Sequence, residues 1–366
     1  MARIGREGSN DRVEQTGQAS AQRSVADLAA SIEACLLGGA IGDALGAEIE
    51  FWPLARIRAA FPDGIDRLPP HDGVAGAITD DTQMTLFTAE GLIRASVRQA
   101  DKGICHVPGI VHHALLRWLR SQGEAAPALA GGGPDGAEPT GLLADPRLHK
   151  RRAPGMTCLS ALMAADRLGQ PATNDSKGCG TIMRVAPLAF LRRDRIRDLA
   201  EDCSALTHGH PTGREAAAAW ALILADLLQG DPLEETARRC LGGFGTEVDG
   251  AIRAALDAPR DGAPETVESL GGGWTAEEAL AIALYACLCA RDFEHGLTIA
   301  VTHGGDSDST GAIAGNALGL IFPDQVVSHR WAREVECRDL IAALSRDLAE
   351  AVAGDPAALF PRYPGA

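Results

Sequence analysis

The stretch GGDSDSTGAIAGNALGLI, residues 304–321, joins an acidic cluster to an apolar helical pattern. Gly311, Gly315 and Gly319 recur every four residues, which places them on one face of a helix. A helix face without side chains lets a neighbouring helix approach closely, so the stretch predicts a tightly packed core helix. The same apolar spacing begins at Val25 and recurs in residues 82–98, 213–229 and 275–290. The sequence therefore predicts an all-α protein.

A second acidic cluster, Thr79-Asp80-Asp81-Thr82, directly precedes the helical pattern that starts at Gln83. One Asp is enough to cap a helix, so an adjacent second Asp with flanking threonines is surplus to that role. Carboxylates this close repel one another in a folded core unless a hard divalent cation holds them. If the two acidic clusters form one site, residues 25–366 form one domain.

Composition and charge indicate which kinds of molecule the protein should not bind and in which compartment it is expected. The formal net charge is -15 and the pI is about 5.1, which argues against binding nucleic acid or an anionic membrane surface. No apolar run is expected to reach transmembrane length, which predicts a protein without membrane spans. The 9 cysteines are an odd number without framework spacing, which favours the reducing cytoplasm. Length and charge leave the oligomeric state open, with a monomer slightly favoured.

Two segments lack helical periodicity. Residues 1–24 are polar and contain glycine, so we expect a disordered N-terminal tail. Residues 123–154 contain GGGPDG and several prolines, so they cannot hold a regular element throughout. This long loop is either a tolerated insertion or a functional lid.

Thr275 and Glu278, by contrast, have capping-box spacing and predict the start of a helix.

The motif that begins at Asp306 also fits two other patterns. An EF-hand loop needs a bidentate Glu at its twelfth position, where this chain has Ala317. The D-x-D-x-T motif of haloacid-dehalogenase-type phosphatases closes a strand near the start of a large α/β domain, whereas only about 55 residues follow here. The EF-hand is therefore disfavoured, and the phosphatase stays a distant alternative.

Three further segments carry weaker signals. Asp43 and Glu50 lie seven residues apart and share a face if helical, although nearby glycines weaken a simple helix. Residues 174–184 form a polar, glycine-rich loop that suits backbone binding of phosphate but lacks a P-loop ending. His208 and His210 have no evident third ligand, so a zinc site is disfavoured.

Six ordered motifs together resemble the ADP-ribosylglycohydrolase family, over residues 31 to about 323. They are GDALGAEIEF (42–51), TDDTQM (79–84), GCGTIMRVAP (178–187), THGHP (207–211), GGGWTAEEAL (271–280) and GGDSDSTGAIAG (304–315). The resemblance implies a compact orthogonal helical bundle with a cleft that binds ADP-ribose. It also implies a binuclear magnesium centre, with manganese as the alternative ion, and hydrolysis of the bond between ADP-ribose and a modified side chain.

The resemblance also implies roles for individual residues. The metal ligands would be Thr79, Asp80, Asp81, Asp306, Asp308 and Ser309. Glu50 and Asp308 are the candidates for the general base, between which the sequence does not decide. Gly178 and Gly180 would hold the diphosphate, His208 would contact the ligand, and Trp274 would stack near the ribose or adenine.

Two positions and one segment depart from the family pattern: residues 123–154 match none of its motifs and are a candidate wall for the pocket that selects the modified residue. Ser309 stands where Thr is usual, and Cys179 replaces a polar residue that is often Asn. Arginine is the expected linkage, with serine linkages and O-acetyl-ADP-ribose as alternatives. Two other functions stay open: a catalytically silent ADP-ribose-binding relative, and a cysteine hydrolase that uses Cys179 with His208.

Overall fold

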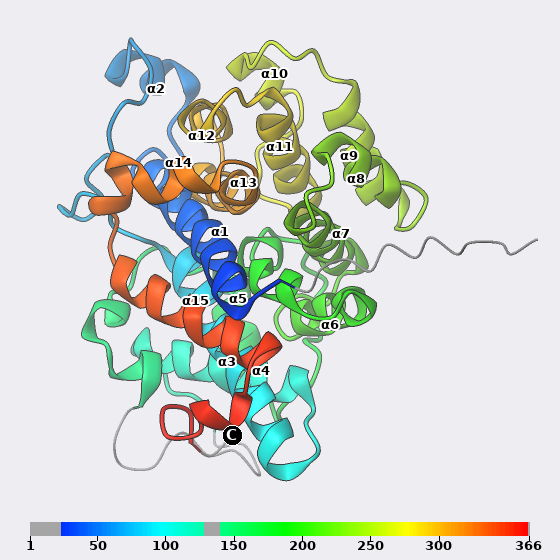
Figure 1. The fold of residues 1–366 in the computed structure, drawn as a ribbon. Coiled ribbons are helices and arrows are strands. Elements are labelled where there is room, and N and C mark those ends of the chain that lie inside the picture. The colour runs from blue at the N-terminus through cyan, green and yellow to red at the C-terminus, as the bar shows by residue number, and fades with distance from the viewer. Residues whose placement is uncertain (1–22, 128–139, 365–366) are drawn as a thin grey trace, which may run out of the picture.

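The computed structural model describes residues 23–127 and 140–364, which form helices and loops with no β-strand in either range (Figure 1). The predicted all-α bundle is confirmed. The α-helices are α1 (Val25–Gly46), α2 (Leu54–Ala60), α3 (Asp80–Lys102), α4 (Val107–Ser121), α5 (Met156–Met163), α6 (Arg193–Ala205), α7 (Pro211–Leu228), α8 (Leu233–Cys240), α9 (Thr246–Asp257), α10 (Pro264–Glu268), α11 (Ala276–Cys289), α12 (Phe293–Val301), α13 (Ser307–Ile321), α14 (Pro323–Ser328) and α15 (Arg338–Ala353). The predicted tail lies outside the described residues except for Arg23 and Ser24.

Helix α1 is the central core helix, and it corrects one expectation from the sequence. Its 22 residues, with a mean hydropathy of 1.5 in the most apolar window, are long and apolar enough to cross a membrane by length and composition. However, 67% of that window is buried inside the protein. Helices α13 and α15 pack against α1 (Figure 1), so its apolar surface is covered by protein.

Glycines bring α1 and α13 into close contact. A Cβ atom added to Gly42 would lie 2.0 Å from the carbonyl oxygen of Gly311. One added to Gly315 would lie 2.1 Å from the carbonyl oxygen of Gly38. No side chain fits at these distances, so the close approach predicted from the glycine spacing is confirmed. The glycines do not end the first helix, because α1 continues through them to Gly46.

The predicted helix starts are confirmed, with one correction in detail. Thr79 caps α3, and its hydroxyl accepts a hydrogen bond from the Asp81 N–H at 3.3 Å. Helix α11 does follow Thr275, but the Thr275 side chain makes no capping hydrogen bond. The Glu278 carboxylate instead accepts from the N–H of Gly272 at 3.2 Å. The capping box is therefore wrong, because the partner of Glu278 lies in the preceding loop.

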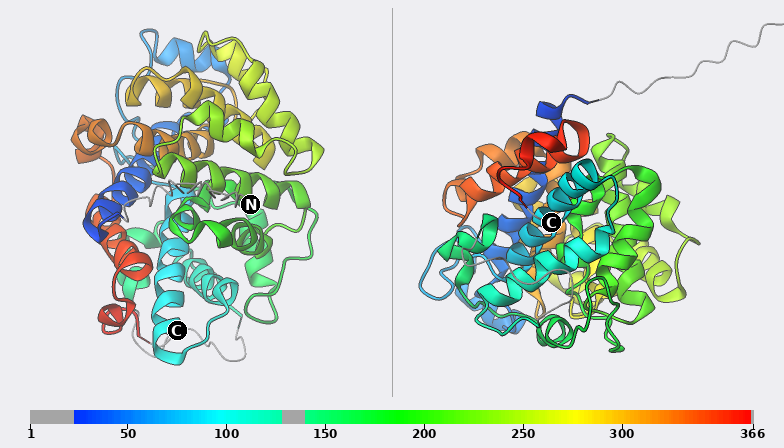
Figure 2. Two further views of the ribbon diagram at one scale, coloured as in Figure 1. Left: turned by 45° about the vertical axis from the view of Figure 1, so that its right-hand side comes forward. Right: turned by 90° about the horizontal axis from the view of Figure 1, so that it is seen from below.

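The hydrophobic core includes residues from Leu28 to Tyr363 and therefore involves both ends of the described chain. Helices α3 and α4, drawn in cyan, lie side by side, and α15 packs against α3 (Figure 2). The described part of the predicted long loop holds two short 3-10 helices, Gly141–Ala144 and Pro146–His149. This agrees with the expectation that no regular element runs through it. The single-domain organisation stays a prediction.

Candidate metal centre

The N-termini of α3 and α13 and the turn after α1 meet at a pocket of about 370 Å³. Five carboxylates line this carboxylate pocket: Glu50, Asp80, Asp81, Asp306 and Asp308. Glu50, Asp306 and Asp308 each have one ligand atom within 4.8 Å of the others. The two acidic clusters, far apart in sequence, therefore belong to one site.

The described residues that line the pocket include no Lys or Arg. Burial, followed by the negative charge of Asp308, raises the pKa of Glu50 to about 10. The pKa values of Asp80, Asp81 and Asp306 are held well above the usual range, first by burial and then by neighbouring carboxylates. These groups cannot all ionise together without a compensating charge.

A divalent cation fits this donor set. The Oδ1 atom of Asp81 is buried and has no hydrogen-bond partner in the described part of the chain. The remaining ligands predicted from the sequence supply further carboxylate and hydroxyl oxygens. Oxygen donors of this kind are the ligands that Mg²⁺ and Mn²⁺ prefer. Thr79 is the one predicted ligand outside the residues that line the pocket, because its hydroxyl caps α3.

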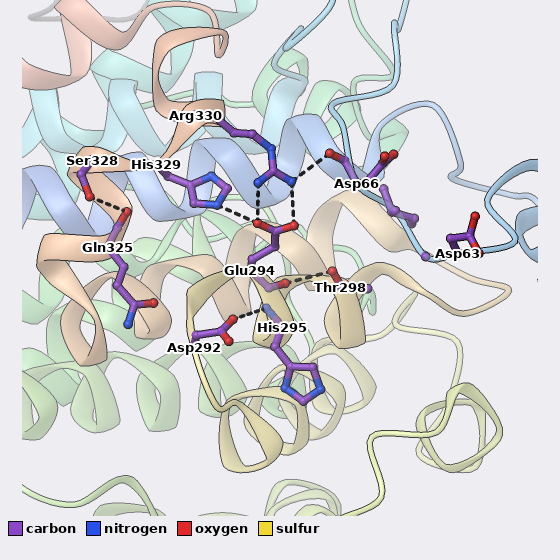
Figure 3. A pocket seen from close by; sticks show the side chains of 12 residues that line it. Asp63, Asp66, Asp292, Glu294, His295, Thr298, Gln325, Ser328, His329 and Arg330 are labelled. Atoms are coloured by element: carbon purple, nitrogen blue, oxygen red, sulfur yellow. Dashed lines mark hydrogen bonds and ion pairs between the residues drawn. The ribbon is translucent and has the colours of Figure 1, made fainter.

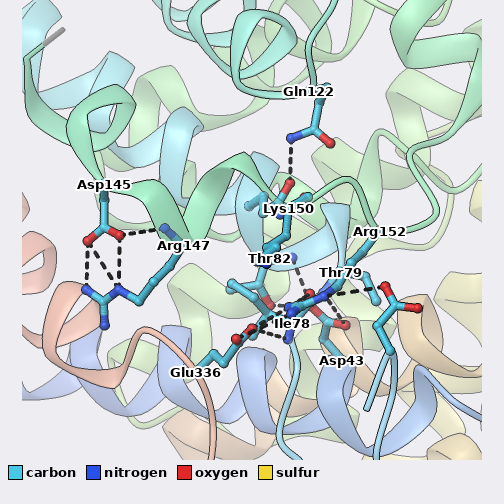
Figure 4. A network of polar contacts seen from close by, with 12 residues as sticks. Asp43, Ile78, Thr79, Thr82, Gln122, Asp145, Arg147, Lys150, Arg152 and Glu336 are labelled. Carbon is cyan, nitrogen blue, oxygen red and sulfur yellow. Dashed lines mark hydrogen bonds and ion pairs between the residues drawn. The ribbon is translucent and has the colours of Figure 1, made fainter. Parts of the chain in front are cut away.

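Asp43 fixes the first turn of α3 from below (Figure 4). Its carboxylate is fully buried and accepts hydrogen bonds from the backbone N–H of Thr79, at 3.0 Å, and of Thr82, at 3.1 Å. Burial, then the charge of Asp308, raises the pKa of Asp43 to about 7. The sequence indicated a shared face for Asp43 and Glu50, but α1 ends at Gly46 and Glu50 lies in the following turn.

The end of the predicted long loop supports the same cluster. The N–H of Asp80 donates to the carbonyl of Arg152 at 3.3 Å, and the N–H of Gly155 donates to Asp80 Oδ2 at 3.1 Å. The buried Arg152 side chain donates to the carbonyl of Ile78 at 2.9 Å and pairs with Glu336 (Figure 4). Residues 153–155 line the pocket, and Arg152 holds the turn before α3 beside them, so this end of the loop is more than a surface insertion.

The glycine-rich loop forms another part of the pocket wall. A Cβ on Gly180 would lie 2.8 Å from Cys158 Sγ and 2.9 Å from His208 Cε1, so only glycine fits there. The Cys179 thiol points at the acidic cluster, with Sγ donating to Asp306 Oδ2 at 2.8 Å. Gly178 and Gly180 line the pocket as expected, but the N–H of Gly178 donates to Ser176 Oγ at 3.3 Å.

His208 lines the pocket and is held from behind. Its Nδ1 atom lies 2.8 Å from the Thr207 hydroxyl, which accepts a hydrogen bond from Arg184 at 2.6 Å. Burial, followed by the positive charge of Arg184, lowers the pKa of His208 to about 3, so the imidazole is neutral. His210 lies outside this arrangement, because its Nδ1 atom accepts from the N–H of Thr212 and caps α7.

Large apolar side chains surround the pocket mouth. The rings of Phe51 and Trp274 stack with centroids 4.9 Å apart and an interplanar angle of 21°. Phe51, Met156 and Trp274 are 70%, 69% and 41% exposed. Phe51 also has a φ of 65°, a left-handed conformation that costs an aromatic residue energy. Such faces suit a planar ligand group, and the sequence had indicated only Trp274.

A second pocket of about 670 Å³ lies beside α12 and α14 (Figure 3). Its most connected carboxylate, Glu294, is already paired, with Arg330 at 2.7 Å and with the His329 ring at 3.0 Å. None of the site residues predicted from the sequence lines it. The carboxylate pocket, and not this larger pocket, is therefore the candidate site.

Sequence reasoning missed Phe51, Met156 and Arg152 as parts of the site, and it indicated Asp43 only through its spacing from Glu50. The motif that contains Asp43 and Phe51 was the available signal for those two residues. No local pattern singled out Arg152.

Comparisons with known proteins give one consistent family. A family model described as ADP-ribosylglycohydrolase matches residues 24–358. The ADP-ribosyl-[dinitrogen reductase] glycohydrolase of Rhodospirillum rubrum is 26% identical, over 82% of this chain and 89% of that protein. ADP-ribosylhydrolase ARH3 of Mus musculus is 23% identical, over 87% of this chain and 89% of that protein.

An uncharacterised protein of Archaeoglobus fulgidus is 27% identical, over 86% of this chain and 95% of that protein. Among solved structures, an ADP-ribosylglycohydrolase-related protein complex matches with a TM-score of 0.65 and 26% identity. That match covers 89% of this chain and 99% of the other, so the similarity extends through the fold and is not confined to the motifs.

Proposed function

The chain belongs to the ADP-ribosylglycohydrolase family, and from this premise we propose that it is a magnesium-dependent hydrolase of ADP-ribosyl-arginine that releases ADP-ribose. The observation that carries the proposal is the convergence of five carboxylates on one pocket whose described lining lacks Lys and Arg. An acidic site of this kind binds an anionic diphosphate substrate only if cations or backbone N–H groups neutralise it.

Asp80, Asp81, Asp306, Asp308 and Ser309 would hold the cations, with Thr79 as a sixth ligand. Two bound magnesium ions would supply positive charge for the ribose hydroxyls and lower the pKa of a bound water. Manganese is the alternative ion for the same oxygen donors.

Residues of the chain would supply the general base and the contacts to the substrate. Glu50 or Asp308 would accept a proton from the attacking water as cleavage passes through an oxocarbenium-like state. The backbone at Gly178 and Gly180 would lie against the diphosphate, where a side chain would block close approach. His208 and Trp274 would contact the ligand from the far wall and the mouth.

Arginine is the proposed linkage because the motifs resemble the arginine-directed branch of the family, and a relative's name specifies ADP-ribosyl-[dinitrogen reductase]. Serine linkages and O-acetyl-ADP-ribose are the alternatives, because the same pocket would serve them. A catalytically silent binder is less favoured, since all six expected ligand positions carry oxygen donors. The cytoplasmic location and the absence of nucleic-acid and membrane partners remain predictions from composition.

The cysteine-hydrolase alternative receives no support from the site. Burial and the Asp306 carboxylate hold the pKa of the Cys179 thiol well above its usual range. The Cys179 thiol donates to Asp306, and the His208 Nδ1 atom is paired with Thr207. A nucleophilic cysteine needs the opposite environment, with a base or a positive charge beside it.

The test is the hydrolysis of ADP-ribosyl-arginine by the purified protein, with magnesium and with EDTA, followed by released ADP-ribose. We expect release that depends on magnesium. Asp81→Ala and Asp308→Ala should each abolish magnesium binding and turnover, whereas Asp198→Ala, an exposed change on α6, should do neither.

Full activity in either cluster variant would overturn the shared centre. Metal-dependent release from serine or O-acetyl substrates alone would reassign the linkage. Binding of ADP-ribose without release from any substrate would identify a silent relative.

A further inference from the structure

Cys179 lines the carboxylate pocket and packs against the edge of the hydrophobic core. Its Sγ atom is 2.8 Å from Asp306 Oδ2 and 3.6 Å from the Ser309 hydroxyl. Both of these residues are predicted metal ligands. The loop backbone fixes the position of the thiol, because the N–H of Cys179 donates to the carbonyl of Trp274 at 3.1 Å.

A second observation supports a metal site at the same place. Asp81 is 3% exposed, and its Oδ1 atom has no hydrogen-bond partner among the residues that the structure describes. Asp81 and Cys179 line the same pocket. A buried carboxylate oxygen without a partner is unfavourable, and a cation bound between the carboxylates and the thiol would satisfy it.

We infer that Cys179 is a sulfur ligand of the proposed metal centre, and that it makes the site bind thiophilic divalent ions such as Co²⁺, Zn²⁺ or Cd²⁺ more tightly than Mg²⁺. The inference rests on the proposed metal centre and deepens it. On binding, the Cys179 S–H bond breaks, a sulfur–metal bond forms, and the proton leaves to solvent. No oxidation or reduction takes place.

The chemistry of the donors explains the selectivity. Mg²⁺ is hard, prefers oxygen and binds weakly to thiolate, whereas Zn²⁺ and Co²⁺ accept mixed sulfur and oxygen ligands. An Asn or Ser side chain at the same position would offer the metal only an oxygen donor. Cys179 offers sulfur instead.

Cys158 provides a matched control. It also lines the pocket and is buried, but no hydrogen bond to a carboxylate is found for it in the described part of the chain. The side chain lies behind Gly180, where a Cβ would be 2.8 Å from its sulfur. A serine at position 158 therefore removes a pocket thiol without removing the proposed ligand.

The experiment is a cobalt titration of the metal-free full chain, followed by absorption spectroscopy. We expect a near-ultraviolet sulfur-to-cobalt charge-transfer band in the wild-type protein and in Cys158→Ser. Cys179→Ser should lack the band and bind Co²⁺ at least about tenfold more weakly, with Mg²⁺ affinity changed by less than about threefold. Cobalt binding without the band in the wild type, or the band persisting in Cys179→Ser, would overturn the inference.

A second measurement does not depend on the folding of a variant. Iodoacetamide labelling of the wild type, mapped by mass spectrometry, should show that Cd²⁺ protects Cys179 and that Mg²⁺ does not. Equal labelling of Cys179 with and without bound Cd²⁺ would contradict the inference.

If the proposed function is wrong, the results differ from those that contradict the sulfur ligand. Either neither cobalt nor magnesium binds to the protein, or magnesium binds but no substrate is hydrolysed. The first of these results would overturn the sulfur ligand together with the centre. With magnesium bound but no hydrolysis, the cobalt charge-transfer band still decides whether Cys179 is a metal ligand.

Discussion

Asp43 holds Thr82 in the first turn of α3 through two hydrogen bonds, one from the Thr82 backbone N–H at 3.1 Å and one from the Thr82 hydroxyl (Figure 4). Asp43 is not itself in the pocket, so it acts by positioning. It sets the direction of the helix start from which Asp80 and Asp81 point into the pocket.

Replacing Asp43 with Asn should weaken magnesium binding by roughly 10- to 100-fold, as expected when a ligand-supporting residue is lost. An amide nitrogen would face the donors of Thr79 and Thr82, so the turn would shift. Calorimetric titration with Mg²⁺ measures the effect. Glu33→Gln, on the same helix, is the control. Wild-type magnesium affinity in Asp43→Asn would refute the positioning role.

The contact between α1 and α13 should tolerate no side chain at Gly42, where a Cβ would lie 2.0 Å from the Gly311 carbonyl oxygen. We expect Gly42→Ala to lower the free energy of unfolding by about 1–3 kcal/mol or more, because the helices must separate. Urea unfolding measures this change.

Gly250→Ala is the matched control for the helix contact. Gly250 lies inside α9, is exposed, and would have nothing within 4 Å of an added Cβ. This variant should gain about 0.5–1 kcal/mol from its better helix propensity. If the two variants changed stability in the same direction, the close packing of α1 on α13 would not be what limits position 42.

The helices and most of the pocket were predictable because their signals are local. Apolar spacing in residues 82–98 and 213–229 follows from one buried face, and it predicted α3 and α7. Asp80, Asp81, Asp306 and Asp308 lie at the starts of α3 and α13, and the sequence indicates both starts. No local pattern shows that these four carboxylates meet in one pocket. That part of the prediction depended on the argument that carboxylates which repel one another share a cation.

The remaining features depend on contacts that no local pattern records. Arg152 supports the Asp80 loop through Ile78 and Glu336, which lie 74 and 184 residues away in sequence. The length and hydropathy of α1 fit a membrane span, and only the packing of α13 and α15 shows that it is a core helix. Thr275 had the right spacing for a capping box, but the loop before α11 offered Glu278 a different donor.

Buried neutral histidines should make the protein acid-labile. His112 is fully buried, its Nδ1 atom accepts the N–H of Gly169 at 3.0 Å, and burial, then Arg184 and His113, lowers its pKa to about 4. Above pH 6.5 the ring is neutral in both states and has no effect. Between about pH 6.5 and 4 the unfolded chain binds the extra proton, so stability falls as pH falls.

Urea unfolding from pH 8 to 4 tests this expectation. The slope from one such histidine is at most about 1.4 kcal/mol per pH unit. His112→Asn keeps an acceptor near Nδ1 and cannot be protonated, so its stability should fall less steeply than that of the wild type below pH 6.5. Parallel curves for the two proteins would show that His112 does not contribute.

The pair of hydrogen bonds from Arg184 to Thr207 and from Thr207 to His208 should fix the tautomer of His208. Arg184 can only donate, so the Thr207 hydroxyl hydrogen is available to His208 Nδ1, which leaves the proton of the neutral ring on Nε2. An Nε2–H donor in the pocket can then bind an oxygen of the ligand. Thr207 is therefore a positioning residue.

Thr207→Val removes the hydroxyl and should lower the affinity for ADP-ribose by roughly 5- to 10-fold, the value of about one hydrogen bond. Thr207→Ser keeps the hydroxyl and should restore the affinity. Nitrogen-15 NMR of labelled histidine should show Nε2–H in the wild type and in Thr207→Ser, and a mixture of tautomers in Thr207→Val. If Thr207→Val weakens binding while its His208 tautomer is unchanged, the effect is one of packing, and the positioning role is wrong.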